Sequence, residues 1–160
     1  MTLYTIGVYE FDAETFLRAL TRKRVTALVD VRARRGVRGH TYAFANAKAL
    51  ETNVTEHGIA YVHEAKLAPT DAIRHAQEKA DEAAGTTIRH RTATTPAFKK
   101  AYREHILGHY TKADLDALLE EAGARPCLMC VETLASACHR SLAAAWIAKR
   151  TGADVVDLTP

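Results

Sequence analysis

Hydrophobic and polar positions along the chain predict short buried strands that alternate with amphipathic helices. Five segments rich in aliphatic, aromatic or β-branched residues are typical of strands, and they span residues 3–9, 25–32, 59–65, 126–132 and 154–158. The segments between them have helical character, and they span residues 12–23, 46–58, 71–85, 95–110, 112–123 and 138–152. This alternation predicts an α/β fold, a three-layer sandwich in which a mainly parallel sheet carries helices on both faces.

The length of the chain, with no linker or repeat, predicts one domain that covers residues 1–160. Segment 71–85 is polar and rich in alanine, which predicts a surface helix, and residues 86–95 are expected to form a loop. No apolar run approaches membrane-spanning length, and the first residues lack a secretion signal. Because three cysteines are an odd number, we expect a reduced cytoplasmic protein rather than a secreted disulfide framework.

Positive charge is concentrated in two regions, although the net charge of +3 is modest. The segment "RARRGVR" places Arg32, Arg34, Arg35 and Arg38 close together, and a second basic region covers residues 89–103. Both regions could attract anions. Two interpretations remain open from charge alone. One is a solvated arginine-rich loop, and the other is a non-catalytic nucleic-acid binding module in which these regions contact phosphates.

The stretch "CLMCVETLASACHR" holds all three cysteines of the chain. Cys127 and Cys130 have the spacing of a zinc knuckle, which Cys138 and His139 could complete. In a strand, however, side chains three positions apart point to opposite faces of the sheet, which argues against this metal site. A cysteine-dependent phosphatase is excluded because its arginine, six positions after the strand-end cysteine, would fall at Ser136.

The end of the fourth predicted strand and the helix start after it carry the strongest candidates for chemistry. Cys130 and Glu132 share a face at the carboxyl end of the strand, where open parallel sheets bind ligands. At the helix start, free N–H groups and the helix dipole favour negative charge. We therefore expect a lowered pKa for the Cys138 thiol beside His139, which suits a nucleophile or redox thiol. The same helix start could instead bind an anion with Arg140, and the cysteines could simply be buried core residues.

Other polar residues lie at the same predicted edge of the sheet. Asp30 and Arg32 end the second strand and form either a structural ion pair or a ligand contact. His63, which shares a face with Tyr61, could be a base, a ligand or a structural histidine. Gly7 is expected to permit a close backbone approach after the first strand. A mononuclear metal site remains an alternative with four candidate ligands: His63, Cys130, Glu132 and His139.

Short motifs at these positions make the chain resemble the DUF488 family over about residues 3–158. The motifs are "YTIG" (4–7), "VDVR" (29–32), "YVH" (61–63), "CVE" (130–132) and "CHRS" (138–141), followed by a helix and "DVVDL" (154–158). The resemblance implies a compact α/β sandwich in which the DVR, CxE and CHR segments gather on one edge of the sheet. It implies no reaction, because the function of the family was undefined when it was described.

The chain departs from the pattern of that family in two places. Val8 and Tyr9 stand where members commonly have a histidine and a serine, and "EAKLAPTDAIR" replaces a loop rich in leucine and glycine. Any role of the missing histidine is therefore lost or moved in this chain, and its substrate or activity can differ from that of its relatives.

These patterns together favour a small cytoplasmic enzyme with a site at the carboxyl edge of the sheet. The expected catalytic residues, which would supply a thiol and move protons, are Cys130, Glu132, Cys138 and His139. The expected substrate-binding residues are Gly7, Asp30, Arg32, His63 and Arg140. The partner is expected to be an anionic small molecule, nucleotide-like, or a nucleic acid, and not a membrane. The residues identify neither a cofactor nor an oligomeric state.

Overall fold

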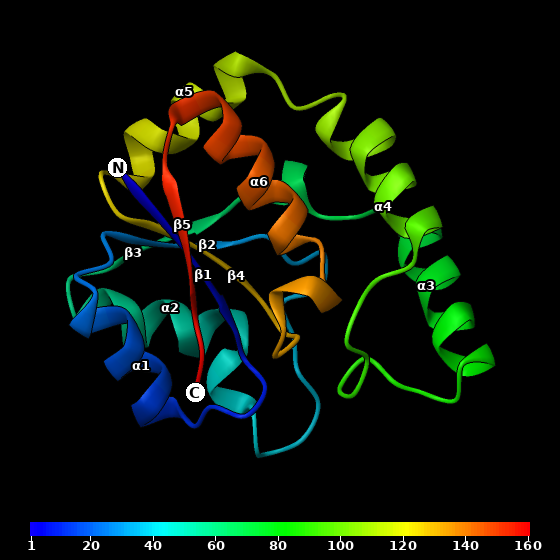
Figure 1. The fold of residues 1–160 in the computed structure, drawn as a ribbon. Coiled ribbons are helices and arrows are strands. Elements are labelled where there is room, and N and C mark those ends of the chain that lie inside the picture. Colours follow the sequence, from blue (N-terminus) through cyan, green and yellow to red (C-terminus); the bar gives the residue numbers. More distant parts are fainter.

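A five-stranded parallel sheet forms the centre of the protein (Figure 1). The computed structural model describes residues 1–160. The strands, in the spatial order β3-β2-β4-β1-β5, are β1 (Thr2–Gly7), β2 (Ala27–Asp30), β3 (Ala60–His63), β4 (Pro126–Cys130) and β5 (Asp154–Leu158). Every neighbouring pair is parallel. The predicted α/β fold is confirmed, and its sheet is parallel throughout rather than mainly so.

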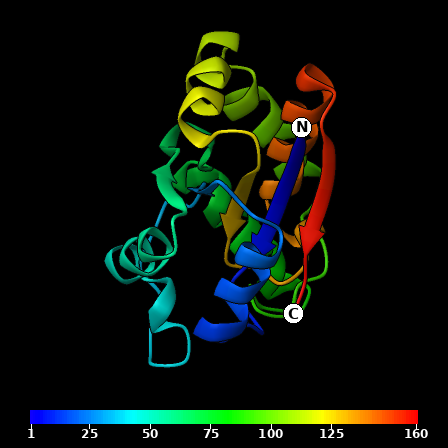
Figure 2. The same ribbon diagram turned by 90° about the vertical axis from the view of Figure 1, so that its left-hand side faces the viewer.

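Helices cover both faces of the sheet, as predicted (Figures 1 and 2). One face packs against α1 (Ala13–Arg22) and α2 (Ala47–Glu56). The other face packs against α3 (Asp71–Ala83), α4 (Pro96–Tyr102), α5 (Lys112–Ala122) and α6 (Arg140–Thr151). Alternation along β4 divides the two cores, because Cys127 faces α1 and α2 whereas Leu128 faces α5 and α6. None of these helices is long and apolar enough to cross a membrane.

Local sequence signals explain where the helices begin. Asp12 caps α1 in a capping box, in which its Oδ1 accepts from the Thr15 amide at 2.7 Å. The predicted helix 138–152 begins two residues later than expected, since Cys138 is extended and α6 starts at Arg140. The predicted helix 95–110 is α4 followed by a π-helical turn, Arg103–Leu107.

The connections between strands open a crevice at the carboxyl ends of β2 and β4. These two strands are neighbours. The chain leaves β2 through α2 toward β3 at one edge of the sheet, and it leaves β4 through α6 toward β5 at the opposite edge. The two helices lie on different faces, so nothing from these crossovers fills the space between the strand ends. Such a switch point is the usual ligand site of open parallel sheets.

Gly7, at the end of β1, allows two segments of backbone to come into contact, as the sequence predicted. A Cβ on Gly7 would lie 1.9 Å from the backbone oxygen of Glu132. Because a backbone carbonyl cannot yield as a side chain does, Gly7→Ala is expected to lower the free energy of unfolding by about 3 kcal/mol in urea denaturation. The matched control is Gly36→Ala, where the nearest atom would lie 3.9 Å from the new Cβ. Its expected effect is within about 0.5 kcal/mol, and equal losses in both variants would contradict this role of Gly7.

Candidate functional site

A cavity of about 380 Å³ occupies the crevice at the carboxyl ends of β2 and β4. Four of the nine predicted site residues line it: Arg32, Cys130, Glu132 and His139. A larger and more open hollow of about 980 Å³ lies between α1 and the C-terminal residues, and none of the predicted site residues lines it. The smaller cavity is therefore the candidate site, because it is the less open of the two and holds the residues that can do chemistry.

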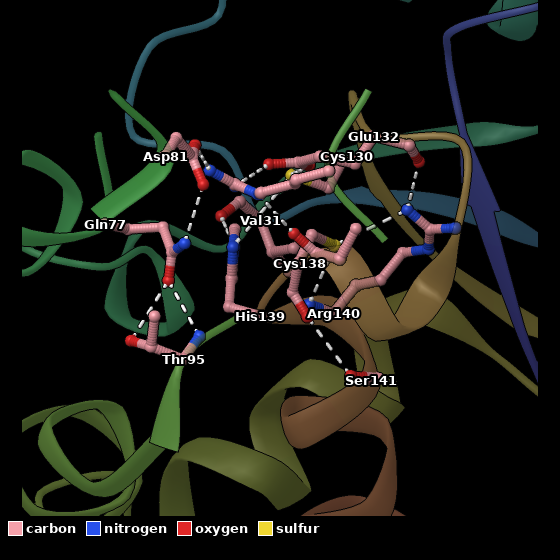
Figure 3. Close-up of polar contacts among 12 residues, drawn as sticks. Val31, Gln77, Asp81, Thr95, Cys130, Glu132, Cys138, His139, Arg140 and Ser141 are labelled. Atoms are coloured by element: carbon pink, nitrogen blue, oxygen red, sulfur yellow. Dashed lines mark hydrogen bonds and ion pairs between the residues drawn. The ribbon is translucent and has the colours of Figure 1, made fainter. Parts of the chain in front are cut away.

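The thiol of Cys130 lies between two groups that can accept its proton (Figure 3). Its Sγ donates to Glu132 Oε2 at 2.9 Å, and Nδ1 of His139 lies 3.9 Å from the same sulfur. The short contact bears out the expectation that Cys130 and Glu132 share a face. Cys127 lies on the opposite face, in the core, so the zinc-knuckle pairing of the two cysteines is also excluded by the structure.

The imidazole of His139 is oriented by a backbone carbonyl. Its Nε2 lies 2.7 Å from the oxygen of Val31 (Figure 3). A carbonyl oxygen can only accept a hydrogen bond, so Nε2 must carry the proton. In the neutral ring, Nδ1 then has a free lone pair directed toward Cys130, which suits a proton acceptor or a metal ligand.

A buried arginine that the sequence did not single out fixes Glu132 in place. Arg91 donates to Glu132 Oε1 at 2.7 Å and to Asp81 Oδ2 at 2.9 Å, and its Nε donates to the oxygen of Ala137 at 2.8 Å. Asp81 in turn accepts from Gln77 at 2.9 Å, which ties α3 to the site. The helix 71–85, predicted to lie on the surface, thus contributes buried polar groups to the site.

Cys138 lies behind the cavity rather than in it. Its side chain is buried, it does not line the cavity, and its sulfur accepts from the Arg140 amide at 3.3 Å. Burial raises the pKa of the Cys138 thiol well above its ordinary value. The expected lowering of this pKa at a helix start is therefore wrong, because the cost of burying a thiolate outweighs the helix dipole and the nearby guanidinium.

Arg140 is enclosed by backbone and does not line the cavity. Its guanidinium donates to the carbonyl oxygens of Glu132 at 2.5 Å and Thr133 at 3.0 Å, and it lies 3.4 Å from Asp157 of β5. Together with Gly7, it joins the ends of β1, β4 and β5. Both residues hold the loop after β4, and neither lines the cavity, so their predicted contact with a substrate stays a prediction.

Asp30 and Arg32 form a buried ion pair at the end of β2. Two nitrogens of Arg32 reach the Asp30 carboxylate at 2.8 and 2.7 Å, and the Tyr61 hydroxyl donates to Asp30 at 2.6 Å. Burial alone would lower the pKa of Arg32, but Asp30 together with Cys130 and Tyr61 raises that pKa, so the guanidinium stays charged. His63 lies 3.1 Å from the backbone oxygen of Arg32 and outside the cavity. Of these residues only Arg32 lines the cavity.

Both basic regions of the sequence meet around this cavity. Six arginines line it: Arg32, Arg34, Arg38, Arg74, Arg89 and Arg91. Two carboxylates, Glu78 and Glu132, oppose them. The lining is therefore cationic apart from the part around Cys130 and Glu132, which we call the floor of the cavity. This charge favours an anionic ligand.

Three of the site residues could also hold a metal ion. The ligand atoms of Cys130, Cys138 and His139 lie within 4.8 Å of one another. Of the tetrad considered from the sequence, His63 and Glu132 are outside this group, and Cys138 takes a place in it. The hydrogen bond from His139 Nε2 to a backbone carbonyl is the kind that orients metal-binding histidines. Sulfur and imidazole ligands fit zinc or another thiophilic ion.

The fold and the cavity define an α/β protein with a candidate site at the switch point of a parallel sheet. The chain belongs to the DUF488 family, described as a domain of unknown function, whose sequence model matches residues 12–147. No curated protein and no solved structure matches the chain. The match confirms the family resemblance, although the motifs "YTIG" (4–7) and "DVVDL" (154–158) lie outside the matched residues. The reaction is left to be inferred from the site.

Proposed function

We propose that this protein is a small enzyme that uses Cys130 as a nucleophile on an anionic, nucleotide-like substrate. The observation that carries the proposal is the cavity itself. It places a thiol and two proton acceptors on its floor and guanidinium groups around its sides. A thiol next to an adjacent base is the usual arrangement of a cysteine nucleophile, and the arginines suit a phosphorylated compound.

The geometry supports a proton route for this chemistry. The Cys130 proton would pass to Glu132 Oε2, and the sulfur would attack an electrophilic carbon of the substrate. As the new S–C bond forms, the bond from that carbon to the leaving group breaks, and the leaving group takes the proton. Water would then cleave the S–C bond and restore the thiol. Arg91 would act as a positioning residue, since it holds Glu132 through the oxygen that does not face the sulfur.

Alkylation of the native protein with iodoacetamide at pH 8 tests the assignment of the thiol. Burial raises the pKa of both Cys127 and Cys138, so their thiols stay protonated where an ordinary thiol begins to ionise. We expect Cys130 to react faster than either, because it is the one thiol of the three that lines the cavity. Peptide mass mapping identifies the modified residue. Preferential labelling of Cys138 would contradict the assignment.

The catalytic part of the proposal needs a turnover measurement. Wild-type protein, Cys130→Ser and Cys138→Ser are incubated with a panel of nucleotides and phosphorylated sugars, and products are followed by mass spectrometry. The proposal predicts turnover that is lost in Cys130→Ser and kept in Cys138→Ser. Loss of activity in Cys138→Ser alone, with both variants folded, would overturn the role of Cys130.

A second candidate function is a metal protein, favoured by the cluster of Cys130, Cys138 and His139. A bound ion would lower the pKa of both thiols and make them ligands instead of nucleophiles. Elemental analysis of protein purified without a metal-affinity column separates the two functions. The nucleophile proposal predicts far less than one ion per chain, whereas about one ion that is lost in Cys138→Ser favours the metal protein.

A further inference from the structure

We infer that Arg32 and Arg74 form a subsite for the phosphoryl group of a small substrate and hold that group as a handle, away from Cys130. The inference rests on the proposed function, since it names how that substrate is held. Both arginines line the cavity, and each has a buried guanidinium nitrogen with no hydrogen-bond partner in the protein. A buried N–H donor without an acceptor is costly, so such donors point to a missing ligand.

Arg32 is the fixed half of the subsite. Its Nε and Nη2 are both taken by Asp30, so the guanidinium plane cannot turn, and its side chain is only 3% exposed. The remaining nitrogen, Nη1, is buried and has no hydrogen-bond partner in the protein. A charged donor already held in place loses little conformational entropy when an oxyanion arrives.

Arg74 is the second half, and it lines the cavity from α3, whereas Arg32 follows β2. Its Nη2 pairs with Asp71 one turn earlier on the helix, and its Nε is the buried nitrogen without a partner. Arg34 and Arg38, both exposed, add positive charge along the same cavity. The donors thus come from two separate elements, namely α3 and the segment that follows β2. Such convergence distinguishes a specific oxyanion site from a basic surface patch.

The charge on the cavity floor keeps a phosphoryl group away from the thiol. Glu132 lies 2.9 Å from Cys130, and the only guanidinium that touches this carboxylate, Arg91, is shared with Asp81. The Glu132 carboxylate would repel an anion beside the sulfur, whereas Arg32 and Arg74 each offer a donor nitrogen that has no partner in the protein. The atom that meets Cys130 is therefore expected to belong to an uncharged part of the substrate.

The rest of the cavity fits such an uncharged part. Apolar and aromatic side chains that include Tyr9, Ile88 and Phe98 line it. Arg89 lies over the ring of Tyr9, with its guanidinium carbon 5.3 Å from the ring centre. About 380 Å³ suits a small organic phosphate rather than a polymer. The phosphoryl chemistry is shared by mononucleotides and nucleic acids, and the small volume of the cavity favours the small molecule.

Binding of inorganic phosphate, measured by calorimetry at low ionic strength, tests the subsite. Arg74→Gln is expected to weaken binding about tenfold, because it removes one charge-assisted hydrogen bond. The matched control is Arg18→Gln, which removes an arginine that pairs with Glu14 in the same way but does not line the cavity. It should bind phosphate like the wild type. Thermal denaturation of each variant shows that it is folded.

Three results would overturn the subsite. They are no phosphate binding to the wild type, equal weakening in Arg18→Gln and Arg74→Gln, or loss of phosphate binding in Cys130→Ser, which would place the anion at the thiol. Adenosine monophosphate and a single-stranded oligonucleotide are compared in parallel. Tighter binding of the oligonucleotide, with a steep salt dependence, would overturn the small-molecule assignment. Failure of the proposed function would give a different result from failure of the subsite. Phosphate would still bind to the protein, but Cys130 would resist alkylation.

Discussion

Replacement of Arg140 by methionine is expected to lower the free energy of unfolding by about 3–5 kcal/mol. The guanidinium is completely buried and donates to the backbone oxygens of Glu132 and Thr133. Methionine fills a similar volume, but it leaves both carbonyls and the carboxylate of Asp157 without this partner. Urea denaturation at pH 7 measures the loss.

The matched control for this variant is Arg150→Met on the same helix. The guanidinium of Arg150 stacks 3.6 Å from the centre of the Trp146 ring at the protein surface. Exposed cation–π contacts contribute about 0.5–1 kcal/mol, so the expected loss is no larger than this. Similar losses in the two variants would show that Arg140 does not hold the ends of β1, β4 and β5 together.

Arg91→Gln is expected to have the second largest effect, again a loss of about 3–5 kcal/mol at pH 7. The variant leaves two buried carboxylates, Asp81 and Glu132, without the guanidinium that neutralises them. Arg91→Lys, which keeps one positive charge between the two carboxylates, should lose less stability than Arg91→Gln. Urea denaturation midpoints of both variants at pH 7 measure this difference.

Arg89→Gln is the control for the electrostatic explanation. Arg89 lines the same cavity and lies over the Tyr9 and Tyr42 rings, but no carboxylate depends on it. We expect a loss of about 1 kcal/mol or less. If Arg91→Lys loses as much stability as Arg91→Gln, packing rather than charge explains the role of Arg91.

The elements of this fold could be predicted because each has a local signal. Apolar runs such as residues 25–32 mark buried strands, and Asp12 marks the start of α1 by its capping chemistry. The pairing of Cys130 with Glu132 could also be predicted, since residues two positions apart in a strand share a face. These inferences depend only on neighbours along the chain.

The parts of the site that could not be predicted depend on distant residues. Arg91 sits in the polar segment "TTIRHRTATT", and its partners Asp81 and Glu132 are 10 and 41 positions away. Nothing local distinguishes it from Arg89. The wrong prediction of a lowered pKa for Cys138 has a related cause. The helix start is visible in the sequence, but the burial of the Cys138 side chain depends on tertiary packing.

The most direct test of the central claim is a crystal structure of the protein grown with adenosine monophosphate. The account predicts a nucleotide in the cavity between β2 and β4, with phosphoryl oxygens on Arg32 and Arg74 and uncharged atoms toward Cys130. A nucleotide bound outside this cavity would contradict the account. So would a metal ion held by Cys130, Cys138 and His139, since those thiols would then be ligands.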